Sequence, residues 1–179
     1  GLHFHTNCDA TDFASLLATA RHIRDSIPQF LDNLDWINMG GGYLFNQSDD
    51  KSDFFHAVNI FRENFGLRVF IEPGAALVRR AGTIEATVHD LFESDGLLIA
   101  VLDTTVNHMA EVFEFQFEPD VLGHTDGGAH EYLLAGCTCL AGDIFGEYTF
   151  DTPLSIGSRV TFLNMGAYTI SKAHRFNGV

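Results

Sequence analysis

The spacing of apolar residues changes character once along the chain, and this change limits the folds that the sequence can adopt. Short apolar runs predict strands at 1–5, 35–39 and 68–71. Between them, apolar residues recur at the helical period over 13–27 and 52–65. Strands that alternate with helices through short connections are typical of a parallel sheet. The first part of the chain is therefore predicted to be an α/β unit.

After about residue 80 the helical period is lost, and turn signals separate the apolar runs. The pattern predicts strands at Thr83–Leu91, Leu97–Asp103, Val112–Phe117, Glu131–Thr138, Ile144–Phe150, Arg159–Leu163 and Tyr168–Lys172. We therefore expect an antiparallel, all-β domain over 81–179, following an α/β part over 1–80. Three strand–helix units are too few to close a barrel of eight, so 1–80 would be the second half of a β/α barrel.

Polar or glycine-rich residues follow each strand of the predicted parallel sheet. His5 follows the first strand, Gly40–Gly42 the second and Glu72 the third. A β/α barrel places its active site at these carboxyl ends. Each feature also has a structural interpretation, namely a buried histidine, a tight turn and a carboxylate on the rim.

A short stretch late in the chain, Gly136–Asp143, combines two thiols, a carboxylate and two glycines. Two small cysteines in a strand are the structural alternative. The Cys-x-Cys spacing is shorter than the spacing that zinc sites prefer, and only His174 follows as a further nitrogen ligand. No metal site is predicted.

The charge balance restricts the classes of partner. The formal net charge is −14, which argues against nucleic acid and anionic membranes and suits a cationic substrate. Three cysteines without a signal peptide favour a cytoplasmic protein. No apolar run approaches the roughly 20 residues of a membrane span.

Taken in order, these motifs resemble a family of pyridoxal-phosphate (PLP) decarboxylases built on the alanine-racemase-type barrel. The family includes ornithine, diaminopimelate and carboxynorspermidine decarboxylases. The run Cys139–Asp143, with Phe145–Tyr148 after it, is most similar to the carboxynorspermidine enzymes. Asn164–Thr169 and the later Phe176–Gly178 resemble the family's C-terminal signature. The resemblance implies a PLP-binding β/α barrel half followed by the antiparallel β-domain.

Within the α/β part, the resemblance implies cofactor contacts. His5 would lie against the face of the PLP ring and take part in catalysis, and Glu72 would pair with the pyridine nitrogen. Cys8 stands where the family often has a phosphate-binding serine. The glycines implied near the cofactor are Gly40, Gly41, Gly42 and Gly74.

Within the β-domain, the resemblance implies that Cys139 is the catalytic proton donor and that Tyr168 binds the cofactor phosphate. Asp143, Glu111 and Asp103 would contact the substrate. For Glu111, an exposed acid in front of a strand is an equal alternative.

The implied reaction removes the α-carboxylate of a polyamine-like amino acid, carboxynorspermidine or carboxyspermidine, in polyamine biosynthesis. Alternatives are a diaminopimelate- or ornithine-type decarboxylase, or a non-catalytic regulatory homologue without PLP. Neither Lys51 nor Lys172 follows an early barrel strand, so the lysine that binds PLP is expected before Gly1, in a longer protein. The family also implies a homodimer with shared active sites.

Overall fold

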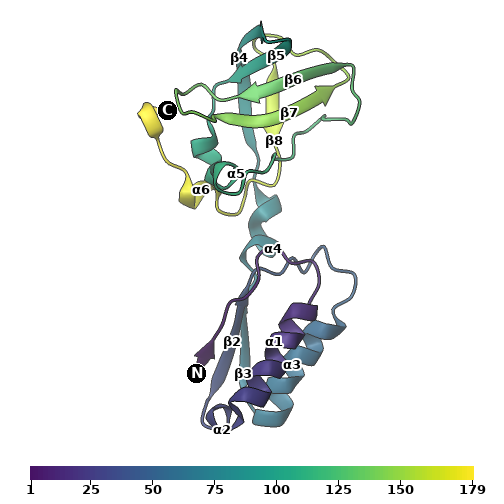
Figure 1. Ribbon diagram of the computed structural model, residues 1–179, viewed down its shortest axis with the longest axis vertical. Helices are drawn as coiled ribbons and strands as arrows, with labels where there is room; N and C mark the ends of the chain where they lie inside the picture. Colours follow the sequence, from purple (N-terminus) through teal and green to yellow (C-terminus); the bar gives the residue numbers. More distant parts are fainter. The chain divides into compact units, whose positions relative to one another are not determined.

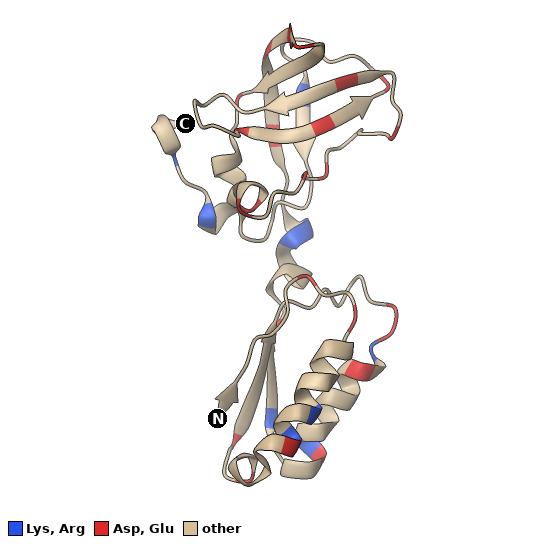
Figure 2. Cartoon of the chain, in the orientation of Figure 1, with Lys and Arg blue, Asp and Glu red and all other residues tan.

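The chain forms two compact units, each described here by itself. The computed structural model describes residues 1–179, and the units comprise Gly1–Leu77 and Val78–Val179 (Figure 1). Each unit has its own cluster of buried apolar side chains. Acidic residues outnumber basic ones in both units (Figure 2). None of the helices has both the length and the apolar character that a membrane crossing requires.

The first unit is a three-stranded parallel sheet with helices packed on it. Its strands lie in the order β1-β2-β3, and α1 and α3 pack against each other on one face of the sheet (Figure 1). This confirms the predicted alternation of strand and helix. The elements are β1 (Leu2–His3), α1 (Ala14–Ser26), α2 (Pro28–Leu31), β2 (Trp36–Gly41), α3 (Ser52–Phe65), β3 (Arg68–Glu72) and α4 (Gly74–Val78).

The ends of the two long helices follow from their flanking residues. Gly66 closes α3 in the left-handed conformation, with φ 66°, which glycine adopts without strain. Asp50 accepts a hydrogen bond from Ser52 N–H at 2.8 Å, and Asp12 accepts one from Ala14 N–H at 3.0 Å. In both cases an aspartate two residues earlier in the chain accepts a hydrogen bond from a free N–H of the first turn.

The second unit is built on a five-stranded sheet in the order β7-β6-β5-β4-β8. Its neighbours are antiparallel except β5 and β6, which are parallel. Parallel neighbours require a long crossover, and this one contains η2 (Val106–Met109) and α5 (Ala110–Phe115). The other elements are η1 (Arg79–Ala81), β4 (Ile84–Ser94), β5 (Leu97–Leu102), β6 (His130–Ala135), β7 (Ile144–Phe150), β8 (Arg159–Phe162), α6 (Thr169–Lys172) and η3 (Phe176–Gly178).

Two of the predicted strands are wrong. Residues 112–117 lie mostly in α5, where Val112 is buried while Phe113 and Phe115 are exposed. Residues 168–172 form α6, in which Lys172 N–H donates to Tyr168 O at 2.9 Å. In both segments the alternation of apolar and polar residues does not correspond to alternating burial.

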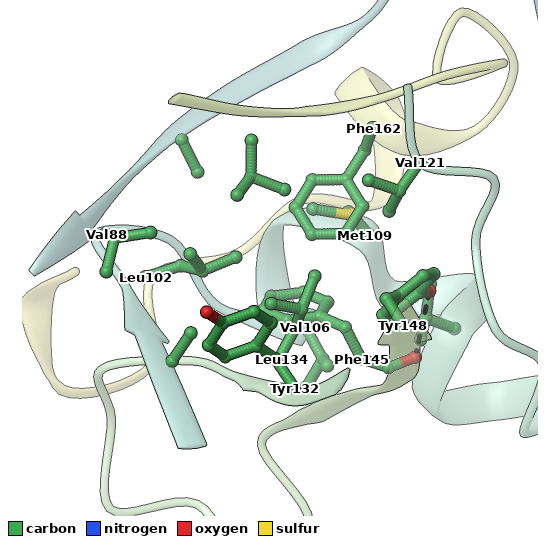
Figure 3. Close-up of a cluster of buried hydrophobic side chains, with 14 of the residues drawn as sticks. Val88, Leu102, Val106, Met109, Val121, Tyr132, Leu134, Phe145, Tyr148 and Phe162 are labelled. Atoms are coloured by element: carbon green, nitrogen blue, oxygen red, sulfur yellow. Dashed lines mark hydrogen bonds between the residues drawn. The ribbon is translucent and has the colours of Figure 1, made fainter. Parts of the chain in front are cut away.

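The core of the second unit lies between the sheet and the crossover (Figure 3). Leu102, Leu134 and Phe162 are fully buried there, and Met109 of η2 packs with them. Tyr148 is buried too, and its hydroxyl donates to Pro119 O at 2.7 Å. This burial, with nearby acidic side chains, raises the pKa of Tyr148 well above its usual range.

Candidate functional site

In the first unit, the predicted residues meet where the three parallel strands end. His5 lies two residues beyond β1, Gly41 ends β2, and Glu72 ends β3 opposite Gly41 in the sheet register. Gly41 N–H donates to His5 Nδ1 at 3.3 Å. An imidazole, a glycine turn and a carboxylate therefore share one edge of the sheet.

Asn38 is a site residue that the sequence reasoning missed. Its side-chain N–H donates to Glu72 Oε1 at 2.8 Å, and its Oδ1 accepts from Gly40 N–H at 2.9 Å. His3 Nε2 also lies 3.7 Å from Glu72 Oε1. Asn38 thus fixes both the carboxylate and the glycine turn. The available signal was an amide inside an otherwise apolar strand.

The glycine triplet allows close approach of backbone at this edge. A side chain at Gly41 would collide with the carbonyl oxygen of Glu72, and one at Gly42 would collide with that of Asn7. Gly40 and Gly42 also have φ values of 71° and 84°, which side chains disfavour. The turn is therefore specific for glycine, as expected of a backbone cradle.

The remaining predicted contacts of the first unit flank this edge. Cys8 is an exposed free cysteine beside the glycine turn, because a side chain at Gly42 would lie 3.1 Å from its Cα. Its loop is anchored by Asn7, whose amide donates to Tyr43 Oη at 2.6 Å. Gly74 begins α4, two residues after Glu72, and is exposed.

These residues fit PLP chemically. A carboxylate suits a protonated pyridine nitrogen, and the two contacts described for Glu72 both involve Oε1, so neither occupies Oε2. The His5 imidazole is exposed, as a group that lies against an aromatic ring must be before that ring binds. The glycine turn lets backbone approach a phosphate without side chains in between, while the N–H groups of Gly40 and Gly41 already donate to Asn38 Oδ1 and His5 Nδ1.

In the second unit, Cys139 lies on an exposed loop between β6 and β7. Asn177, near the end of the chain, donates its side-chain N–H to Cys139 Sγ at 2.7 Å. Asn177 adopts φ 58°, a left-handed conformation that asparagine tolerates. The sequence reasoning included Asn177 only as part of a signature and assigned it no contact.

Asp143 lies in the same loop but is 5% exposed. Its carboxylate accepts hydrogen bonds from Thr105, Val106 and Thr138, all within the second unit. The predicted substrate contact would therefore compete with donors that already surround the carboxylate.

Glu111 and Tyr168 meet around Lys172. The Lys172 ammonium lies 2.6 Å from Glu114, 3.5 Å from Glu111 and 5.2 Å from the Tyr168 ring centroid. The hydrogen bond to Glu114 is the largest cause that raises the pKa of Lys172. Glu111 therefore already has a cationic partner in its own unit.

Asp103 lies directly after β5 and is exposed. Its carboxylate accepts a hydrogen bond from Thr87 N–H at 2.6 Å, and this bond is the largest cause that lowers the pKa of Asp103. The carboxylate is therefore ionised near neutral pH and open to solvent.

Cys137 provides a test of the electrostatics of the loop. Partial burial of its thiol, reinforced by Asp143 and Asp103, raises the pKa of Cys137. Only the thiolate reacts with iodoacetamide. We therefore expect the rate of Cys137 alkylation, monitored by mass spectrometry, to increase with pH. The midpoint of this increase should lie at a higher pH than that of a free cysteine peptide. A midpoint at or below the peptide's would contradict this environment.

The comparisons with known proteins identify the family of this chain. Residues 8–166 match the family described as pyridoxal-dependent decarboxylase, C-terminal sheet domain. A carboxynorspermidine/carboxyspermidine decarboxylase of Herminiimonas arsenicoxydans is 34% identical over 100% of this chain and 49% of its own length. A carboxyaminopropylagmatine decarboxylase of Synechocystis sp. is 35% identical over 100% of this chain and 47% of its own length.

Solved structures give the same result. The carboxynorspermidine decarboxylase of Campylobacter jejuni, solved with norspermidine, is similar over 100% of this chain and 52% of its own, with a TM-score of 0.89 and 31% identity. The chain thus spans about half the length of the relatives that it matches. By its sequence and its fold, the chain belongs to the pyridoxal-dependent decarboxylases and includes their C-terminal sheet domain.

Proposed function

We propose that the protein containing this chain is a PLP-dependent decarboxylase that removes the α-carboxylate of carboxynorspermidine or carboxyspermidine in polyamine biosynthesis. The observation that carries the proposal is the meeting of His5, the glycine turn and Glu72 at one sheet edge. The likeness to the Herminiimonas and Campylobacter enzymes supports the substrate class. The net charge of −14 suits a cationic substrate.

Each proposed contact has a physical role. When bound, PLP withdraws the electrons that the departing carboxylate leaves behind. Glu72 keeps the pyridine nitrogen protonated, His5 supports the ring face, and the glycine turn with Cys8 and Tyr168 holds the phosphate. Gly74, two residues after Glu72, is proposed as a further backbone contact of the cofactor. Cys139 delivers the proton that replaces the carboxylate.

The lysine that binds PLP is proposed to lie outside these 179 residues. Lys51 donates to Ser48 O at 2.8 Å before α3, and Lys172 is held by Glu114. Neither directly follows a strand of the parallel sheet.

A second substrate follows from the Synechocystis relative, which is named for carboxyaminopropylagmatine. This compound would present a guanidinium group where the proposed substrates present an amine. Asp103 is the proposed partner of the distal cation, since it is ionised and exposed. Glu111 would first have to release Lys172.

The test is CO₂ release by the full-length protein with PLP and a panel of amino acids. We expect kcat/KM to be highest for carboxynorspermidine or carboxyspermidine. A preference for carboxyaminopropylagmatine would support the second substrate, and a preference for ornithine or diaminopimelate would contradict both. Failure to bind PLP or release CO₂ from any of them would identify a non-catalytic homologue.

We also propose a cytoplasmic homodimer with shared sites, in which the Cys139 loop of one subunit completes the site of the other. The cytoplasm keeps the Cys139 thiol reduced, and all three cysteines are free. Exposed apolar side chains of the second unit, including Phe113 and Ile144, offer a surface for association.

Shared sites predict complementation between two variants that each form little amine product. When Glu72→Ala and Cys139→Ala proteins are mixed equally and allowed to exchange, half of the dimers are mixed, and each mixed dimer has one intact site. We expect recovery of about a quarter of the wild-type rate of amine formation. No recovery, with exchange confirmed by differently tagged subunits, would contradict shared sites.

A further inference from the structure

Four polar residues of the second unit are buried beside the cysteine loop, and hydrogen bonds connect the side chains of three of them. They are Thr104, Thr105, Asn107 and Asp143, each at most 5% exposed. The first three lie in the segment shortly after β5, and Asp143 directly precedes β7. A buried carboxylate is costly unless it is fully hydrogen-bonded, so the contacts of Asp143 indicate what it is for.

The two carboxylate oxygens of Asp143 bind different segments of the chain. Oδ1 accepts from Thr105 Oγ1 at 3.0 Å and from Val106 N–H at 2.9 Å. Oδ2 accepts from Thr138 N–H at 3.1 Å and from Thr138 Oγ1 at 2.5 Å. One side chain therefore ties the segment after β5 to the residue that immediately precedes Cys139.

The backbone of the loop closes around the same carboxylate. Gly136 N–H donates to Asp143 O at 2.7 Å, and Asp143 N–H donates to Leu140 O at 3.0 Å. Cys137 N–H donates to Thr104 O at 3.1 Å. A side chain at Gly136 would collide with the Asp143 carboxylate, so the glycine leaves room for it.

The network also reaches the C-terminal segment that contacts Cys139. The side-chain amide of Asn107 donates to Thr105 Oγ1 at 2.9 Å, and the backbone carbonyl of Asn107 accepts from His174 N–H at 3.1 Å. Three residues after His174, Asn177 donates to Cys139 Sγ. Cys139 is thus approached by two segments that the Asp143 network connects.

We propose that Asp143 is a positioning residue for the Cys139 thiol and does not bind substrate. This inference rests on the proposed role of Cys139 as the proton donor. By fixing Thr138 and the segment after β5 together, Asp143 holds the thiol where its proton reaches the substrate α-carbon. Proton transfer depends steeply on placement, so a loosened loop lowers the rate and misdirects the proton.

The test is Asp143→Asn in the full-length protein. Asparagine keeps the shape but places an N–H₂ group against two donors, so about half of the hydrogen bonds of the carboxylate are lost. In the PLP-free protein, we expect the rate of Cys139 alkylation by iodoacetamide to change at least threefold. In the loaded enzyme, we expect kcat for amine formation to fall roughly 10- to 100-fold, the carbonyl share to rise, and KM to change less than twofold.

Two further variants complete the design. Asp120→Asn alters an exposed carboxylate of the same unit, which accepts from Asn164 at 2.6 Å, and should leave all readouts unchanged. If Asp143→Asn does not fold, Thr138→Val removes the hydroxyl that donates to Oδ2 and accepts from Leu140 N–H at 3.3 Å, and it should shift the same readouts in the same direction by a smaller factor.

The outcomes separate this inference from the proposed function. A raised KM with clean amine product would overturn the inference and make Asp143 a substrate contact. Unchanged Cys139 alkylation and an unchanged product ratio would also overturn it. If the wild-type protein releases no CO₂, the proposed function fails, whereas the alkylation of Cys139 in the PLP-free protein still decides whether Asp143 positions the loop.

Discussion

Replacing Glu72 with glutamine in the full-length protein is expected to lower kcat by roughly 100- to 1000-fold, the typical loss for one preorganised electrostatic contact. The amide keeps the hydrogen-bonding shape and can still meet Asn38, which donates to Oε1 at 2.8 Å. It cannot supply the negative charge that keeps the pyridine nitrogen protonated. The phosphate contacts remain, so the affinity for PLP, measured by spectroscopic titration, should fall much less than kcat.

The control for this substitution is Glu63→Gln, which removes an exposed carboxylate from α3 at a distance from the strand ends. Its kcat should equal that of the wild-type protein. Near-normal turnover of Glu72→Gln would mean that this residue is only a charge on the rim of the sheet. Equal losses of PLP affinity and turnover would indicate a structural role.

The first unit was predictable because its signals are local. Apolar residues at the helical period mark α1 and α3, and Gly66 marks a helix end by its left-handed conformation. His5, Gly40–Gly42 and Glu72 stand at the ends of the predicted strands. Because parallel strands end at the same edge of a sheet, these residues could be expected to lie together.

The second unit was harder because its connections are not local. The parallel pairing of β5 with β6 depends on a crossover, and the segment 112–117 within it alternates like a strand. The helix in this segment is determined by tertiary packing, in which Val112 is buried in the core and Phe115 is exposed.

Candidate site residues could be proposed from the sequence where they belong to a motif, and they were missed where their contacts come from a distant part of the chain. Asn38 acts through Glu72, 34 residues later, and Asn177 through Cys139, 38 residues earlier. Asp143 was recognised from its motif, but its burial and its bonds to Thr105 and Val106 could not be read from spacing. The chemistry of a polar residue depends on the partners that folding gives it.

Replacing Cys139 with alanine should divert the products of the reaction more than it slows the release of CO₂. The proposed reaction requires a proton at the substrate α-carbon, and a proton delivered one atom further, on the side of the cofactor, yields a carbonyl compound instead. A positioned acid typically contributes roughly 100- to 10,000-fold to such a transfer. We expect the rate of amine formation by Cys139→Ala to decrease by a factor within that range. The share of carbonyl product should rise, and the enzyme should lose activity progressively.

Cys137→Ala is the matched control, because Cys137 lies two residues earlier in the same loop and is also a free cysteine. Partial burial raises the pKa of Cys137, so its thiol remains protonated near neutral pH. Asn177 donates its hydrogen bond to Cys139 and not to Cys137. Chromatography of the products should show clean amine from Cys137→Ala. Only amine from Cys139→Ala, or mixed products from Cys137→Ala instead, would show that the proton comes from another group.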